Sequence, residues 1–89
     1  MNQVVVLGDV LSINNEEKEF SLSVPRSKFL YTDESVNDIL ICKGDKVLNR
    51  NVFSFVREQD KLLLKGRIQE DNGKYYILVE SYQVLQRKV

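Results

Sequence analysis

Positively charged and aromatic side chains alternate in one short segment of the chain. Arg26, Lys28, Phe29 and Tyr31 fall within six residues. Binding a single strand of nucleic acid without regard to its sequence requires cations along the phosphates and flat rings on which bases stack. The segment is therefore a candidate nucleic-acid contact. The alternative interpretation is a loop that packs Phe29 onto the core and leaves Arg26 and Lys28 solvated.

A second candidate surface lies on a predicted hairpin in the C-terminal third of the chain. Two strand-like runs flank Asn72-Gly73, and both turn residues tolerate the positive φ that a tight two-residue turn requires. Side chains alternate between the two faces of a strand, so Ile68 and Tyr75 are predicted to face the core. The outward surface then contains Lys65, Arg67, Lys74 and Tyr76, and Lys43 on a preceding strand is a further candidate phosphate contact. An ordinary polar strand face is the alternative.

The residue types present give little support to catalysis or metal binding. The chain has no histidine, which is the commonest general base and transition-metal ligand. Its one cysteine, Cys42, lies in an apolar run and is predicted to be a buried core residue. The sequence therefore predicts a protein that is not an enzyme, with no catalytic residues, no cofactor and no metal.

Net charge and hydropathy indicate what the protein can bind and where in the cell it is located. The 13 basic and 13 acidic residues balance, so strong nonspecific attraction to nucleic acid is not expected, although one positive face remains possible. The apolar run at residues 4–7 is too short for a signal peptide, and no segment has the length of a membrane span. We expect a cytoplasmic protein that does not contact membranes.

The predicted elements are five strands and one short helix. The strands cover residues 3–11, 19–24, 38–43, 61–69 and 74–85, and the helix lies between the third and fourth strands, starting at Asp45. The run at residues 52–56 is also compatible with a strand. This order matches the all-β OB-fold, a five-stranded barrel with a helix between strands three and four. Gly8 and Gly66 would let long strands bend around the barrel, and residues 1–89 would form one domain.

The first strand is apolar on both of its faces, whereas a barrel strand with one wet face should alternate. Val5 and Leu7 point away from the predicted core, and Leu63 adds to this excess of outward apolar surface. Such a surface with no internal partner indicates a subunit interface. We expect a homo-oligomer, either a dimer or a tetramer, that buries Val5, Leu7 and Leu63.

Three segments of the chain resemble the bacterial single-stranded DNA-binding protein family. Residues 2–10 are similar to its opening strand, residues 64–69 to its fourth strand with a Gly-Arg-aliphatic triplet, and residues 79–85 to its closing segment. The resemblance covers the DNA-binding domain, and it implies single-stranded DNA as partner and a role in replication, recombination or repair. Replication or recombination proteins are possible further partners.

The chain also departs from that family. It has no tryptophan, it carries Lys43 where an aromatic residue often precedes the glycine of strand three, and its hairpin turn is short. We expect a short relative without the acidic C-terminal tail. A tailless OB-fold protein also resembles the primosomal replication protein, so the alternative function is a primosome-like protein-interaction adaptor with weak or no DNA binding.

Overall fold

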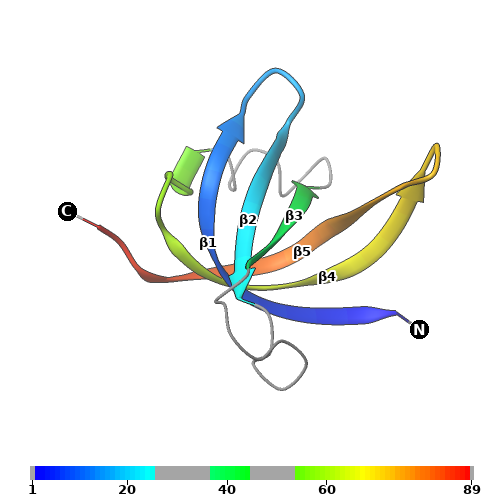
Figure 1. The fold of residues 1–89 in the computed structure, drawn as a ribbon. Helices are drawn as coiled ribbons and strands as arrows, with labels where there is room; N and C mark the ends of the chain where they lie inside the picture. The colour runs from blue at the N-terminus through cyan, green and yellow to red at the C-terminus, as the bar shows by residue number, and fades with distance from the viewer. Residues whose placement is uncertain (1, 26–36, 45–53, 89) are drawn as a thin grey trace.

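Five strands make up most of the chain that the computed structural model describes, which comprises residues 2–25, 37–44 and 54–88. The strands are β1 (Gln3–Asn14), β2 (Glu19–Pro25), β3 (Asn37–Gly44), β4 (Lys61–Asp71) and β5 (Lys74–Gln86). Hydrogen bonds join them in the order β1-β2-β3-β5-β4, and β4 also pairs with β1, which closes the barrel (Figure 1). Only β3 and β5 are parallel among these pairs. The predicted all-β OB-fold barrel is confirmed.

The short helix predicted between β3 and β4 is not confirmed. Most of its residues, 45–53, lie outside the described residues. In the described remainder only Ser54 and Phe55 have helical backbone, which is too short to form an element. Within the same described ranges, no helix has the length and hydropathy needed to cross a membrane.

The core is formed by alternate side chains of the strands. In β2, Phe20 and Leu22 are buried as their spacing predicts, and Cys42 of β3 is also fully buried. Burial raises the pKa of the Cys42 thiol to about 12, so this residue has the predicted role of a small apolar core side chain. The buried apolar cluster comprises Val10, Phe20, Leu22, Cys42, Val56, Leu62, Leu64, Ile77 and Val79.

The turn expected from the sequence is present, and the backbones approach closely at the two strand glycines. Asn72 and Gly73 both have positive φ, 52° and 79°, as a primed two-residue turn requires. At Gly66 the register between β4 and β5 shifts, and a Cβ atom there would lie only 2.1 Å from the Leu78 carbonyl oxygen. At Gly8 a Cβ atom would lie 2.6 Å from the Ser23 carbonyl oxygen. Both glycines thus allow backbones to approach closely.

An ion pair between the buried Asp60 and the exposed Arg87 joins the end of β5 to the segment that leads into β4. Asp60 is fully buried and accepts two hydrogen bonds from the Arg87 guanidinium, of 3.0 Å from Nε and 2.9 Å from Nη2. The Arg57 backbone N–H donates a further bond of 2.9 Å to the Asp60 carboxylate. The Asp60 N–H and carbonyl bond the backbones of Arg57 and Val10. These bonds compensate the cost of burying the charge.

We predict that Gly66→Ala destabilises the barrel by about 1–3 kcal/mol, because the added methyl group has to displace the β5 backbone rather than a flexible side chain. Urea unfolding followed by circular dichroism measures the loss. Lys65→Ala is the control, since Lys65 is exposed on the same strand. An unfolding midpoint for Gly66→Ala equal to that of Lys65→Ala would contradict the close approach of the two strands.

We predict that the stabilising effect of Asp60 depends on pH. Hydrogen bonds from the Arg87 side chain lower the pKa of the Asp60 carboxyl against the opposing effect of burial. A lowered folded-state pKa means that the unfolded chain binds more protons, so the stabilisation is complete above the unfolded value and disappears as the pH falls through the folded value. The difference in unfolding free energy between wild type and Asp60→Asn should therefore be constant near neutrality and shrink below about pH 4. A difference that stays the same at every pH would refute this role for the Asp60 charge.

Candidate nucleic-acid interface

The outer face of the β4–β5 hairpin carries the predicted cluster of cations and one ring. Lys65, Arg67 and Lys74 are exposed, and Tyr76 is half-buried. In the register of the hairpin, Lys65 lies opposite Ser81 and Tyr76 opposite Gln69. The Tyr76 hydroxyl donates a hydrogen bond of 2.9 Å to the Gln69 side-chain oxygen, which holds the ring against β4.

A lysine from β3 extends this surface. Lys43 pairs in register with Leu78 of β5, and its Nζ atom lies 4.7 Å from the centroid of the Tyr76 ring. A cation at this distance from an aromatic face gains about 0.5–1 kcal/mol at an exposed site. Residues far apart in sequence therefore meet on one outer face, and we call Lys43, Lys65, Arg67, Lys74 and Tyr76 the hairpin face.

Acidic residues are interleaved with the cations of this face. The Arg67 Nε atom lies 3.3 Å from a carboxylate oxygen of Glu80, and both side chains are exposed. Lys74 stands opposite Asp71 across the turn, and Lys43 stands opposite Glu19 of β2. An exposed ion pair adds at most about 1 kcal/mol to stability, but these carboxylates reduce the positive potential that the hairpin face presents to a phosphate.

The four residues of the other candidate segment, Arg26, Lys28, Phe29 and Tyr31, lie outside the described residues. Their proposed contact with nucleic acid stays a prediction.

Two residues that were expected on the core side are exposed. Tyr75 is 68% exposed and Ile68 is 43% exposed. The pairing of β1 with β4 stops at Arg67, and the pairing of β3 with β5 begins at Ile77. Ile68 and Tyr75 lie beyond these limits, where the hairpin projects from the barrel (Figure 1). Their side of the strand was predicted correctly, but their burial was predicted wrongly because no third strand covers them.

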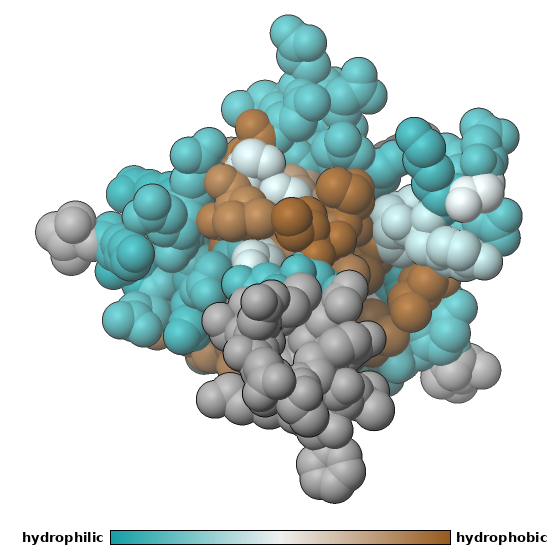
Figure 2. All heavy atoms as spheres, in the orientation of Figure 1, coloured by the Kyte–Doolittle hydropathy of each residue, from teal (hydrophilic) through white to brown (hydrophobic). Residues whose placement is uncertain are grey.

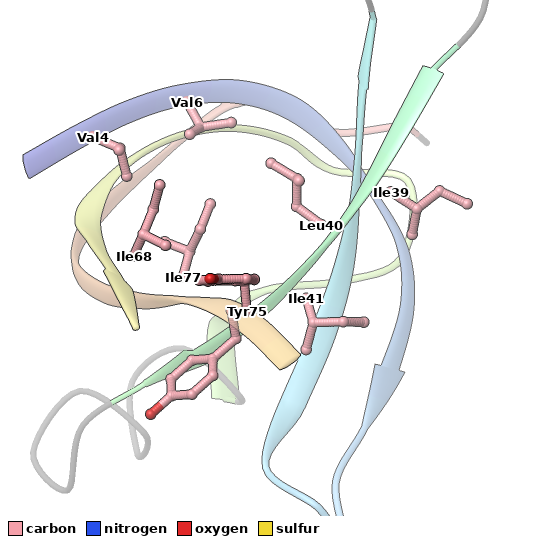
Figure 3. Close-up of a pocket in the computed structure, with 9 residues that line it drawn as sticks. Val4, Val6, Ile39, Leu40, Ile41, Ile68, Tyr75 and Ile77 are labelled. Carbon is pink, nitrogen blue, oxygen red and sulfur yellow. The ribbon is translucent and has the colours of Figure 1, made fainter. Parts of the chain in front are cut away.

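An apolar groove opens where the hairpin leaves the barrel. Val4 and Val6 of β1, Leu40 of β3, Ile68 of β4 and Ile77 of β5 converge on one hollow, with Tyr75 at its edge (Figure 3). On the face shown in Figure 2, apolar side chains gather at the centre, with hydrophilic ones above and to either side of them. A cavity of about 240 Å³ lies there, lined by Val4, Val6, Ile39, Leu40, Ile41, Ile68, Tyr75, Tyr76 and Ile77. The groove could not be predicted from the sequence, because it exists only where the pairing of β1 with β4 ends.

No group of metal-ligating side chains was found among the residues that the structure describes. The hairpin face offers one ring together with ammonium and guanidinium groups to a ligand, and carboxylates lie beside them. Such groups bind by stacking, charge and hydrogen bonds.

No protein-family model and no curated protein sequence matches the chain. Its fold is nonetheless similar to several solved structures. A small single-stranded DNA-binding protein from Mycoplasma pneumoniae has a TM-score of 0.73 at 12% identity, over 100% of this chain and 99% of that chain. A small single-stranded DNA-binding protein from Streptomyces coelicolor has a TM-score of 0.69 at 12% identity, over 92% of this chain and 90% of that chain.

The protein PriB from Ralstonia solanacearum is also similar, with a TM-score of 0.74 at 9% identity over 97% of this chain and 99% of that chain. Sequence identities this low show a shared fold and leave function to be argued from the site. The resemblance found in the sequence is thereby confirmed at the level of the fold, and the chain has the OB-fold barrel of small single-stranded DNA-binding proteins.

Proposed function

We propose that the protein binds single-stranded DNA without regard to sequence and acts in replication, recombination or repair. One observation supports this function above others: Lys43 and Tyr76 come from different strands and meet at 4.7 Å on the outer face of the barrel. Cations that follow the phosphates and rings that stack on bases are what such binding requires. The barrel is also shared with proteins from Mycoplasma pneumoniae and Streptomyces coelicolor that are named for binding single-stranded DNA.

In this proposal the hairpin face contacts DNA by electrostatic attraction and stacking, without chemistry or a cofactor. Arg67 and Lys65 are exposed and able to reach phosphates. Glu80 offsets part of the Arg67 charge, so few counterions would be released and affinity would depend weakly on salt. We further propose that residues 1–89 form one domain and act in the cytoplasm.

A protein-interaction adaptor is the second candidate function, and the interleaved acidic residues favour it. Glu19, Asp71 and Glu80 each stand beside a cation of the hairpin face. Mixed charge around a patch of apolar side chains is typical of the rim of a protein interface. An adaptor of this kind would bind DNA weakly or not at all and would contact replication or recombination proteins.

We also propose that the protein is a homo-oligomer, either a dimer or a tetramer, in which β1 forms the contact between the copies. Val5 is 59% exposed and Leu7 is 49% exposed, and Leu7 lies opposite Leu63 of β4. Among the described residues, the part of β1 before Asp9 pairs with β4 only. An apolar strand with one unpaired edge is prone to associate, so a second copy is the partner that this surface fits.

We predict that the protein binds a labelled oligo-dT saturably in fluorescence anisotropy and binds duplex DNA much more weakly. The logarithm of the affinity should fall with the logarithm of the salt concentration by about 0.7 for each phosphate contacted. Lys65→Gln should reduce that slope by about 0.7 because it removes one phosphate contact.

Lys88→Gln is the matched control for this experiment. Lys88 lines a different hollow, together with Asp9, Leu11 and Gln59, so its removal should leave the slope unchanged. If the wild-type protein does not bind at tens of micromolar in low salt, the DNA-binding proposal is wrong and the adaptor function is favoured.

We predict that light scattering at micromolar concentration gives the mass of a dimer or a tetramer. Leu7→Glu should shift the protein toward monomer, because it places a charge in the apolar contact. Ile39→Glu is the control, since Ile39 is 63% exposed but lies on β3. A monomeric wild-type protein would exclude the proposed β1 interface.

A further inference from the structure

The two tyrosines at the start of β5 differ in what their rings already contact. The Tyr76 ring has the Lys43 ammonium over it, and its hydroxyl is bonded to Gln69. Tyr75 is 68% exposed. It lies at the edge of the apolar groove, beyond the pairing of β1 with β4 and of β3 with β5 (Figure 3). Of these two rings, Tyr75 therefore offers the larger open face to a ligand.

Tyr75 borders a hollow between β3 and the tip of the hairpin. The hollow has one aliphatic wall, at Ile41, and its rim carries charges of both signs. Its lining consists of Glu19, Ile41, Lys43, Asp71, Lys74, Tyr75 and Tyr76. It adjoins the apolar groove, since Ile41 and both tyrosines line the two spaces together.

The charges around this hollow balance one another. Lys43 stands opposite Glu19 in the β2–β3 register, and Lys74 stands opposite Asp71 across the turn. A phosphate would gain little from two cations that each face a carboxylate. A flat and uncharged group that stacks on a ring and contacts an aliphatic wall matches the hollow better.

We propose that this hollow holds one unpaired nucleobase, stacked on Tyr75 and packed against Ile41. The proposal rests on the proposed function and specifies how the hairpin face would use it. Lys43 and Tyr76 act as a preassembled pair that shapes one side of the hollow, and Tyr75 supplies the stacking surface. A base in a duplex has both of its faces covered by neighbouring bases, so the hollow would select single strands.

The test compares Tyr75→Leu with Tyr75→Phe in oligo-dT anisotropy over a series of salt concentrations. Leucine keeps apolar bulk but removes the ring, whereas phenylalanine keeps the ring. We expect Tyr75→Leu to weaken binding at least about fivefold, as the loss of one stacked base requires. The salt slope should stay unchanged, and Tyr75→Phe should bind like wild type. Because Tyr75 is exposed, neither variant should unfold the barrel.

Other outcomes separate this proposal from the one on which it depends. If wild type binds oligo-dT and Tyr75→Leu binds equally well, the base site is wrong and the DNA-binding function stands. The base site is also wrong if Tyr75→Leu changes the salt slope, because the residue would then act by positioning charged groups. A change in the oligomeric mass in light scattering would likewise refute the base site, because the residue would then belong to a subunit contact. If wild type binds no DNA, both proposals are wrong.

Discussion

The close contact of the β4 and β5 backbones at Gly66 is the constraint on which the rest of the barrel depends. No side chain fits between the two strands there, since a Cβ atom would meet the Leu78 carbonyl oxygen. The register shifts at the same place, and such a shift bends a strand and increases its twist. At the same place β5 also pairs with β3, since Cys42 to Gly44 lie opposite Ile77 to Val79.

The same geometry determines where a ligand can bind. Because β1 stops pairing with β4 at Arg67, the rest of the hairpin extends past the closed barrel as two strands. Its inward side chains then line an open groove rather than a core, and its outward side chains meet Lys43 from β3. The candidate site is therefore a consequence of how the barrel closes, and its residues come from strands that are distant in sequence.

Much of this fold could be predicted from the sequence, because local patterns are strong at particular places. The alternation in β2 predicted the burial of Phe20 and Leu22, and Asn72-Gly73 predicted the turn. Each predicted strand lies within an observed one. The exposure of Tyr75 could not be predicted, because alternation tells which side a residue faces but not whether another strand covers that side.

The balance of charge on the hairpin face could not be predicted either, because it depends on cross-strand register. Glu80 beside Arg67 and Glu19 opposite Lys43 are neighbours only after the strands pair. This balance has a consequence for the proposed function. With each of these cations near a carboxylate, one copy of the barrel would gain little from phosphates, and stacked rings would supply most of the affinity.

A site of this kind is weak when it acts alone, and self-association would change that. Once one copy in a dimer has bound a strand, the second site meets the same strand at a high effective concentration, so the overall affinity rises without any new contact. The outward Val5 and Leu7 of β1 and the partly neutralised charge of the hairpin face would then serve the same function. The apolar surface would join copies, and the joined copies would compensate for the low charge of each site. Assembly and DNA binding would in that case be coupled, because a strand long enough to reach two sites stabilises the dimer that it bridges.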